Sequence, residues 1–244
     1  RCRAVSCVVD ARDLRFAYEP GREVLRGVDF QLHRGESVAV FGRNGSGKTT
    51  FLLHLNGILR GEGHLRVCDL PVTRANLPLI RRKIGFLFQD PEDQLFRPTV
   101  LEDVCFGPLR AGLSHAEAEQ RARRALAAVG VEDGLDRAPY HLSSGEKQRV
   151  ALAGILAVEP EVLILDEPTT HLDPPARRAL LELLRGLPQA KLIVTHDAPF
   201  ARALCPRAVF FEQGRIVADG PCADVIRRFG WDLESPPETS PAPR

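Results

Sequence analysis

Apolar and polar residues alternate near the start of the chain, as they do in β-strands with one buried face. The segments LRFAY (14–18) and VDFQL (28–32) alternate in this way, and EPGRE (19–23) between them is typical of a hairpin turn. The segment SVAVF (37–41) is apolar after its first residue, which predicts a short buried strand. Residues 12–41 are therefore predicted to be rich in β-structure.

Four further apolar segments predict buried strands later in the chain. They are KIGFLF (83–88), VLIL (162–165), LIV (192–194) and AVFF (208–211). Helices are expected over TTFLLHLNGIL (49–59), near 174–187 and near 198–204. Strands that alternate with helices predict a mainly parallel sheet in an α/β fold, because each helix carries the chain back across the sheet.

Residues 99–158 have helical spacing instead. Ser114 and Glu117 form a capping-box pattern before a helix with one apolar face, made by Ala118, Ala122, Ala125, Leu126 and Val129. We expect one α/β domain over 1–230, with an N-terminal antiparallel β subdomain and a helical subdomain at about 90–158. The Pro-rich segment SPPETSPAPR (235–244) predicts a disordered tail over 231–244.

Composition narrows the class of protein. The 244 residues carry a formal charge of +1, which gives no electrostatic footprint for nucleic acid, and the basic run QRARR (120–124) reads as an exposed helix face. The longest apolar run, VALAGILAV (150–158), is too short to span a bilayer, and the first ten residues lack the apolar length of a signal peptide. The six cysteines have no zinc spacing. A soluble, cytosolic chain with reduced thiols is expected.

The segment GRNGSGKT (42–49) matches the pattern of a phosphate-binding loop between a strand and a helix. Its glycines let backbone N–H groups surround phosphates, Lys48 supplies a charge at the β- and γ-phosphates, and the Thr49 hydroxyl ligates Mg²⁺. The alternative is an ordinary Gly-rich turn with a surface lysine, which the flanking strand and helix disfavour.

Two acids follow the predicted strand VLIL, at the strand end where α/β sheets place ligands. Asp166 is expected to hold Mg²⁺ through water, and Glu167 to act as the general base for the attacking water. Two solvated acids at a strand end are the alternative.

Gln89 and His196 also follow buried strands, so both are expected at the same edge of the sheet. Gln89 is predicted to contact Mg²⁺ or the water, and His196 to hydrogen-bond the γ-phosphate. Either residue alone would more often be an ordinary polar residue at a strand end.

The segment LSSGEKQRV (142–150) places Ser143, Ser144 and Gly145 at the start of a helix, which is the build of a second anion site. No second lysine-bearing loop accompanies it.

These motifs, in this order, resemble the ATPase subunits of ABC transporters over residues 12–220. The matches are GRNGSGKTT (Walker A), Gln89 (Q-loop), LSSGEKQRV (signature), VLILDEP (Walker B), THLD at 170–173 (D-loop) and His196 (switch histidine). The resemblance implies an ATP hydrolase with ATP and Mg²⁺ as cofactors, and makes Tyr18 the aromatic that stacks on adenine; a core tyrosine is the alternative. The implied ATP-binding residues are Tyr18, Gly42, Arg43, Asn44, Gly45, Ser46, Gly47, Lys48, Thr49 and Thr50.

In this family two ATPase domains pack head to tail, so the resemblance implies a second ABC ATPase chain, identical or not. The signature residues Ser143, Ser144, Gly145 and Glu146 would close over ATP held by that partner. Ser144 and Glu146 depart from the usual L-S-G-G-Q, and His171 is larger than the residue often found in the D-loop. These departures are expected to affect the turnover rate more than the role of the signature.

The segments FQDPEDQLF (88–96) and FGPLRAGLS (106–114) resemble the ATPases of energy-coupling-factor transporters, especially the cobalt and nickel type. The implied function is uptake of a trace cation or vitamin, from the cytoplasmic face of the membrane, with a transmembrane coupling protein and a membrane-embedded capture protein. Leu95 and Phe96 beside Glu92 and Asp93 are predicted to seat an amphipathic helix with a basic end; a plain surface loop is the alternative.

Two other functions remain as alternatives. A soluble ABC ATPase of DNA repair or translation would usually carry coiled-coil insertions, two ATPase units or basic surfaces, and none is present in the sequence. A phosphate-loop kinase or GTPase would leave the signature and His196 unexplained.

Overall fold

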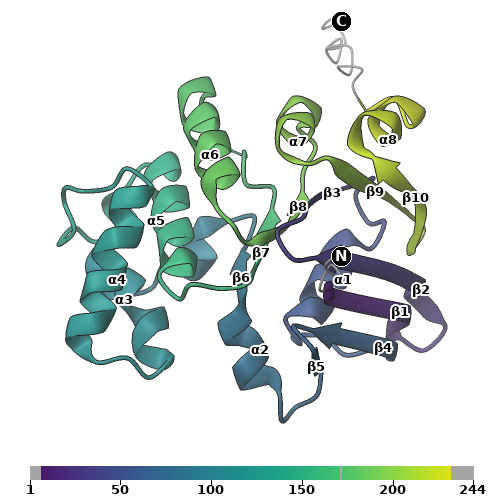
Figure 1. Ribbon diagram of the computed structural model, residues 1–244, viewed down its shortest axis with the longest axis horizontal. Coiled ribbons are helices and arrows are strands. Elements are labelled where there is room, and N and C mark those ends of the chain that lie inside the picture. The colour runs from purple at the N-terminus through teal and green to yellow at the C-terminus, as the bar shows by residue number, and fades with distance from the viewer. Residues whose placement is uncertain (1–6, 171, 232–244) are drawn as a thin grey trace, which may run out of the picture.

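The computed structural model describes residues 7–170 and 172–231 of the chain (Figure 1). The N-terminal strands form a separate antiparallel sheet with the order β2-β1-β4-β5. The strands are β1 (Cys7–Glu19), β2 (Arg22–His33), β4 (Glu62–Val67) and β5 (Leu70–Pro71). The hairpin predicted around residues 19–23 is confirmed, since β1 pairs antiparallel with β2 up to Glu19 and Arg22.

The second sheet forms the centre of the molecule and has the order β10-β9-β3-β8-β7-β6. Its strands are β3 (Ser37–Gly42), β6 (Ile84–Leu87), β7 (Val162–Asp166), β8 (Ala190–Val194), β9 (Arg207–Glu212) and β10 (Arg215–Pro221). The first five are parallel to one another, and only β10 at the edge is antiparallel. The predicted mainly parallel α/β sheet is confirmed, and the carboxyl ends of β3, β6, β7 and β8 share one edge.

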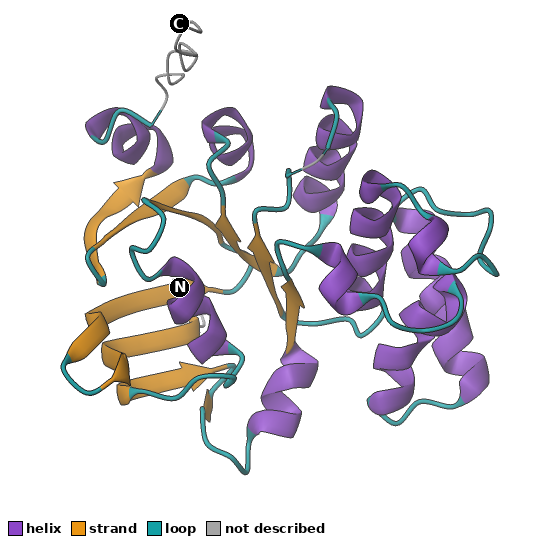
Figure 2. Cartoon of the chain, turned by 180° about the vertical axis from the view of Figure 1, so that it is seen from behind, coloured by secondary structure: helices purple, strands orange, loops and turns teal. Residues whose placement is uncertain are grey.

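Helices cover both faces of this sheet, and a group of three lies to one side of it (Figure 2). The helical subdomain consists of α3 (Val100–Arg110), α4 (His115–Ala128) and α5 (Ser144–Leu156), with short 3₁₀ turns at Pro91–Gln94 and Pro139–His141. The other helices are α1 (Lys48–Leu55), α2 (Leu77–Lys83), α6 (Pro174–Gly186), α7 (Ala198–Leu204) and α8 (Cys222–Arg228).

Side chains of β3 show how the sheet divides the interior into two cores. Ala39 and Phe41 pack with residues of the helical subdomain and of α6 to α8. Val38 and Val40 pack with α1 and the antiparallel sheet. Successive residues of a strand point to opposite faces, so a strand buried on both sides is almost wholly apolar, as SVAVF is after Ser37.

The capping box predicted before the apolar helix of the middle region is confirmed. The Ser114 hydroxyl accepts a hydrogen bond from the Glu117 amide, and the Glu117 carboxylate accepts one from the Ser114 amide at the start of α4. The face predicted to be apolar is buried: Ala118, Ala122, Ala125, Leu126 and Val129. This packing fixes α4 against α3 and α5.

The helix after the phosphate loop is shorter than predicted, because it ends at Leu55 rather than running through residue 59. Gly57 has a left-handed φ of 64° and its amide donates to the His54 carbonyl at 3.0 Å, while the Ile58 amide donates to the Leu53 carbonyl at 3.0 Å. These two bonds form the Schellman termination that glycine favours. The Asn-Gly pair at 56–57 was a stop signal that the apolar residues around it concealed.

Two sets of elements lie outside the sequence prediction: β4, β5 and α2 between residues 62 and 83, and β10 with α8 after residue 214. The predicted tail begins at Trp231, which the structure places against Phe41 and Phe210. Residues 232–244 and His171 lie outside the described residues.

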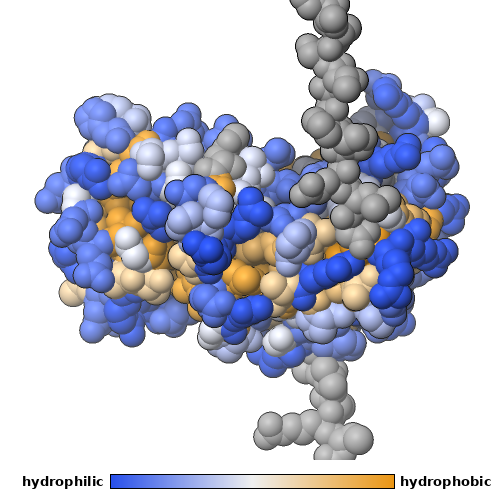
Figure 3. Space-filling model, turned by 90° about the horizontal axis from the view of Figure 1, so that it is seen from above, coloured by the Kyte–Doolittle hydropathy of each residue, from blue (hydrophilic) through white to orange (hydrophobic). Residues whose placement is uncertain are grey.

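The described residues include no helix that is both long and apolar enough to cross a bilayer. Hydrophobic residues nevertheless form a band across the face seen in Figure 3, with hydrophilic residues on both margins.

Candidate functional site

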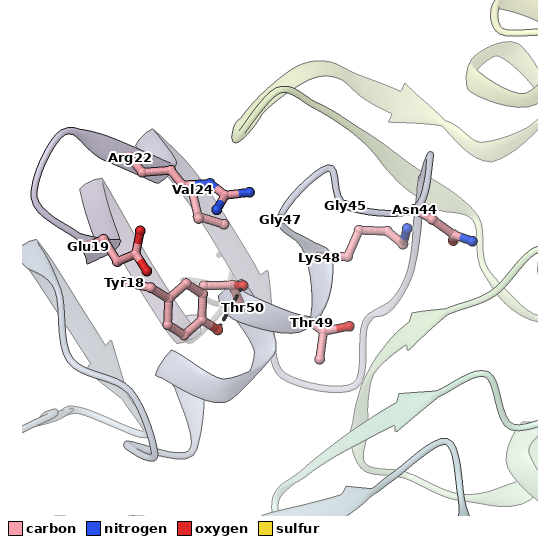
Figure 4. Close-up of a pocket in the computed structure, with 10 residues that line it drawn as sticks. All are labelled: Tyr18, Glu19, Arg22, Val24, Asn44, Gly45, Gly47, Lys48, Thr49 and Thr50. Carbon is pink, nitrogen blue, oxygen red and sulfur yellow. Dashed lines mark hydrogen bonds between the residues drawn. The ribbon is translucent and has the colours of Figure 1, made fainter.

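The phosphate loop (residues 42–49) joins the end of β3 to the start of α1 beside a cavity of about 610 Å³. The lining combines this loop and α1 with the β1–β2 hairpin, which lies across the cavity in Figure 4. The lining residues are Tyr18, Glu19, Arg22, Val24, Asn44, Gly45, Gly47, Lys48, Thr49 and Thr50. Most of the residues predicted to bind ATP are thus gathered around one hollow.

Backbone geometry of the loop requires glycine at two of its positions. Gly47 caps α1 with a φ of 108°, and Gly42 has a φ of 145° with the Phe211 carbonyl so close that a Cβ would collide with it. These values are rarely adopted by residues with a Cβ. The resulting turn aims the first amides of α1 at the cavity, where the helix dipole favours an anion.

Lys48 is buried and its ammonium group donates to backbone carbonyls of its own loop, Gly42 at 2.6 Å and Arg43 at 3.1 Å. Burial lowers the pKa of Lys48, and the nearby Glu167 and Asp166 carboxylates act in the opposite direction. The Ser46 hydroxyl is also buried and has no hydrogen-bond partner. A cation held only by carbonyls, and an orphaned hydroxyl beside it, fit a bound phosphate group.

Tyr18 lies on the hairpin with 58% of its surface exposed, so it is not the core residue of the alternative interpretation. Its ring meets Phe16 edge to face at 4.8 Å, and its hydroxyl lies 3.3 Å from the Thr50 hydroxyl at the floor of the cavity (Figure 4). An exposed ring fixed at one edge leaves its face free for a flat ligand. Arg22 in the same lining was missed by sequence reasoning, because an arginine in a hairpin turn carries no motif.

Asp166 ends β7 directly beside the phosphate loop. It is buried, and the Thr49 hydroxyl donates to its carboxylate at 3.5 Å. Burial raises the pKa of Asp166, while Lys48 and the Thr49 hydrogen bond lower it. A hydroxyl and a carboxylate together offer the hard oxygen ligands that Mg²⁺ prefers.

Glu167 follows in a left-handed conformation with a φ of 49°, which is uncommon for a residue with a side chain. Its amide donates to the Val194 carbonyl at 2.9 Å, and its carboxylate accepts the His196 amide at 3.2 Å. These bonds hold Glu167 between β7 and β8. Burial raises the pKa of Glu167 to about 7, against the lowering effect of the His196 amide.

His196 follows β8 and brings its Nε2 atom to 3.3 Å from the Glu167 carboxylate. Its side chain is half exposed, and burial and Lys48 together lower its pKa. The ring stacks on Trp231, a contact that sequence reasoning missed because Trp231 was assigned to the tail. Lys48, Asp166, Glu167 and His196 therefore meet at one edge of the sheet, although 148 residues separate the first from the last.

Gln89 follows β6 at the same edge and is exposed. The segment that carries it is fixed by Gln94, whose side-chain amide donates to the Phe86 carbonyl at 2.8 Å and accepts the Phe88 amide at 3.0 Å. Gln94 was missed by sequence reasoning. It braces the strand end and so determines where Gln89 can lie.

The signature residues begin α5 in the helical subdomain and line no part of the cavity at the phosphate loop. Ser143 is the N-cap and Ser144 and Gly145 lie in the first turn, whose amides have no acceptor within the helix. The predicted helix start is confirmed. The chain thus has two separate helix starts, at Lys48 and at Ser144, whose first amides have the geometry to bind an anion.

Glu146 is engaged in a way the sequence interpretation did not foresee. Its carboxylate accepts the Ser143 amide at 2.9 Å and the Ser143 hydroxyl at 2.8 Å, and Arg137 donates to it at 3.2 Å. The Ser143 hydrogen bonds and Arg137 lower the pKa of Glu146. Its charge is therefore bound in a capping box instead of projecting alone toward the anion site.

Many known proteins are similar in sequence to this chain. The family model described as "ABC transporter" matches residues 25–170. A putative ABC transporter ATP-binding protein of Streptomyces coelicolor is 53% identical over 89% of this chain and 84% of its own length. The energy-coupling factor transporter ATP-binding protein EcfA of Methanothermobacter thermautotrophicus is 42% identical over 90% of this chain and 73% of its own length.

Solved structures of similar fold also belong to ATP-binding proteins of this kind. The cbiO1 protein of Clostridium perfringens, described as part of the ABC transporter complex cbiONQ, has a TM-score of 0.81 and 34% identity over 93% of this chain and 96% of that one. A dimeric ATP-binding cassette in a post-hydrolysis state, bound to ADP and Pi, has a TM-score of 0.79 and 29% identity over 88% of this chain and 98% of that one.

Proposed function

We propose that this chain, which belongs to the ABC transporter family of ATP-binding proteins, energises an importer of the energy-coupling-factor type. The observation that carries the proposal is the meeting of Lys48, Asp166, Glu167 and His196 at one sheet edge, together with a second anion site at Ser143–Gly145 that lines no part of the same cavity. The first group suits ATP hydrolysis. The second suits a nucleotide held by another chain.

In the proposed hydrolysis, Lys48 leaves the carbonyls of its loop and binds the β- and γ-phosphates, while the loop amides surround them. Arg22 and the face of Tyr18 contact the nucleoside half of the ligand. Thr49 and Asp166 supply oxygen ligands for Mg²⁺, with Gln89 as a further ligand, and the ion when bound neutralises developing phosphate charge. The roles of Lys48, Thr49 and Asp166 rest on the groups around the cavity and on the Thr49–Asp166 hydrogen bond. The role of Gln89 rests on its place after β6 at the same sheet edge.

Glu167 is the proposed general base. Its pKa near 7 means that it accepts a proton from water more readily than an ordinary carboxylate does, while a large fraction remains ionised near neutral pH. His196 brings its Nε2 atom close to the Glu167 carboxylate and orients it. In the proposed mechanism His196 also hydrogen-bonds the γ-phosphate. The hydrogen bond from the backbone amide of His196 to the Glu167 carboxylate keeps the two residues together.

Ser143, Ser144 and Gly145 are proposed to contact the γ-phosphate of ATP bound by a second ABC ATPase chain. A helix N-terminus supplies both free amides and a favourable dipole for that contact. The solved cassette bound to ADP and Pi is dimeric, which supports the pairing of two such chains. Both half-sites are present in this chain, so two identical copies would form two complete sites.

The membrane partner is proposed to dock beside Phe96 and Phe106. These exposed rings meet edge to face at 4.9 Å and line a hollow of about 200 Å³. The buried Asp103 carboxylate accepts the Phe96 and Arg97 amides at 2.8 and 2.7 Å, which fixes the loop that displays Phe96. A preformed apolar groove suits an amphipathic coupling helix.

The docking loop is also joined to the signature helix. Glu92, from the turn after Gln89, forms an ion pair with Lys147 on α5. Movement of a helix in the groove would therefore pull on α5 and shift Ser143. By resemblance, the complex lies on the cytoplasmic face of the membrane, and a separate capture protein selects a cobalt or nickel ion or a vitamin.

The test is recovery of partners with ATP-trapped protein. Tagged Glu167→Gln protein is incubated with ATP and detergent-solubilised membranes of the native host, and bound proteins are identified by mass spectrometry. Small polytopic membrane proteins are expected, and they should be reduced with Lys48→Ala protein, which lacks the phosphate contact. Recovery of only soluble proteins or nucleic acid would overturn the transport proposal in favour of a soluble ABC ATPase.

A further inference from the structure

Four arginines surround one hollow of about 610 Å³ between α2 and the end of α3. Arg81 and Arg82 come from α2, Arg74 precedes it, and Arg110 ends α3. The side chains come from segments about 30 residues apart in the sequence, so the cluster is a product of the fold. These four residues and the surface between them are called the arginine hollow below.

No acidic side chain among the described residues forms an ion pair with any of these four arginines. Within residues 7–170 and 172–231, the one hydrogen bond from a side chain of the four is a 3.4 Å bond from Arg81 to the Asn56 carbonyl. Elsewhere in the described residues, eleven arginines form ion pairs with carboxylates, as Arg207 does with Glu36 and Asp219. Four like charges without a counter-charge favour an anionic partner.

The other residues that line the hollow carry no polar side chain and are called its apolar floor below: Leu77, Pro78, Gly107, Ala111 and Val158. Leu79 on α2 adds an exposed apolar side chain nearby, with 49% of its surface accessible. The expected occupant therefore carries apolar side chains as well as negative charge. Inorganic phosphate or a free nucleotide would leave this apolar floor uncovered.

The arginine hollow continues the groove at Phe96 and Phe106. Arg81, Gly107 and Val158 line both hollows, so no ridge of other residues separates them. Figure 1 shows α2 at the lower end of β6, at about the level of the lower end of the helical subdomain. A helix that lies on the two phenylalanines can thus extend over the arginines.

We propose that the arginine hollow receives an acidic segment of the same membrane partner, so that the docked polypeptide carries Asp or Glu beside its apolar residues. This inference rests on the proposed function and names the chemistry of the partner. Guanidinium groups bind carboxylates with paired hydrogen bonds, and four of them around an apolar floor suit a segment with two or more acids. A flat anionic bilayer would meet the rim of a recessed surface but leave its floor empty.

The test uses purified full-length chain and three labelled peptides of about 16 residues, or about four helical turns. All three carry the same Leu and Ala face, and one end carries two Glu, two Gln or two Lys residues. Binding is measured by fluorescence anisotropy at fixed, near-physiological salt, because charged contacts weaken as salt rises.

The chain is expected to bind the Glu peptide at least about tenfold more tightly than the Gln peptide, a difference that one charge-assisted pair can supply. Arg74→Gln/Arg110→Gln should lose this preference. Arg178→Gln/Arg215→Gln removes the same charge from exposed positions elsewhere and should keep it. Thermal melts of both variants check that each is folded.

Equal binding of Glu and Gln peptides by the unmodified chain would overturn the inference, as would equal loss in both double variants. Cosedimentation with phosphatidylglycerol and phosphatidylcholine vesicles tests a lipid surface. Vesicle binding that needs Arg74 and Arg110, without peptide discrimination, would replace the acidic segment by lipid. ATP turnover by the unmodified chain and the membrane pull-down test the proposed function separately, so either can fail alone.

Discussion

The indole ring of Trp231 stacks on the imidazole ring of His196, with their centroids 5.4 Å apart and their planes 24° from parallel. Trp231 is anchored on its other sides, because it meets Phe210 edge to face at 5.4 Å and its amide donates to the Ile226 carbonyl at 3.0 Å. The segment after α8 thus fixes an aromatic surface over the proposed switch histidine. His196 lies between this surface and Glu167.

Trp231→Ala should therefore lower kcat for ATP hydrolysis by up to about tenfold, the value of one aromatic contact of about 1.4 kcal/mol. The KM for ATP should change little, because Trp231 does not line the nucleotide cavity. Trp231→Phe should retain most of the activity. Steady-state kinetics checks this, and equal changes in kcat and KM, or equal loss in the Phe variant, would contradict a positioning role.

Trp231 is also the one tryptophan of the chain, so its fluorescence reports on His196 directly. If His196 moves to a γ-phosphate, the stack is disturbed and the emission should change on addition of Mg²⁺ and ATP. ADP should have a smaller effect, since it lacks that phosphate. A fluorescence titration measures both, and an identical response to the two nucleotides would contradict the proposed contact.

Replacement of the proposed general base should separate binding from chemistry. Glu167→Gln keeps the shape of the side chain but removes its basicity, so turnover should fall by roughly 10²–10⁴-fold. ATP should still bind, and gel filtration with ATP should show a stable dimer. Glu132→Gln, at an exposed position outside the site, is the control and should behave like the unmodified chain. Near-normal turnover of the Glu167 variant would show that another group is the base.

Burial of Glu167 also predicts a pH dependence of turnover. The carboxylate must be ionised to accept a proton, and its pKa is raised to about 7, so kcat/KM should rise as pH increases through about 7 and level off above. An ordinary carboxylate would give that rise near its usual 4.5. A pH–rate profile decides between these, and a flat profile between pH 5 and 8 would contradict the raised pKa as the controlling group.

The raised pKa of Glu167 also makes the free energy of unfolding depend on pH. Because the folded state holds the proton of Glu167 up to about pH 7 and the unfolded chain releases it near 4.5, stability is lost as pH rises between these values. Glu167→Gln has no such group. Its melting temperature should exceed that of the unmodified chain by a margin that grows from pH 4.5 to 7 and is constant above, as differential scanning calorimetry can measure.

The sequence predicted the elements that carry the site better than it predicted their ends. β7 and β8 are buried on both faces and carry the apolar runs VLIL (162–165) and LIV (192–194), and the polar residues after these runs lie at the shared edge. Parallel strands make that edge common to distant segments. Asp166, Glu167 and His196 could therefore be assigned to one site without coordinates.

Other parts of the site depend on packing that leaves no local pattern. Trp231 reaches His196 because α8 folds back on β9, and Arg22 reaches the nucleotide cavity because the hairpin lies over α1. Glu146 looked like an unfavourable charge beside an anion site. Its partner Arg137 lies nine residues away across a loop, and the sequence gives no reason to pair the two.

The signature offers the clearest test of action between chains. Gly145 has room for a side chain, since an added Cβ would meet only Leu172 at an ordinary 3.7 Å, so Gly145→Ala and Gly145→Val should both fold. The larger side chain would project over the first turn of α5, where a partner's phosphate is proposed to bind. Val should therefore lower turnover more than Ala, while ATP binding by a single chain is retained, because Gly145 lies outside the nucleotide cavity.

Ser143→Ala tests the same signature and, unlike the Gly145 variants, also removes the N-cap of α5. It removes the hydroxyl that accepts the Glu146 amide, so the free energy of unfolding should fall by about 0.5–2 kcal/mol, as for other serine caps. Hydrolysis should fall as well, since the same hydroxyl is proposed to contact the partner's nucleotide. Mixing an excess of Lys48→Ala chains, which keep their signature, with Ser143→Ala chains should restore part of the turnover through one complete site per mixed dimer. No recovery in the mixture would show that the signature acts within its own chain.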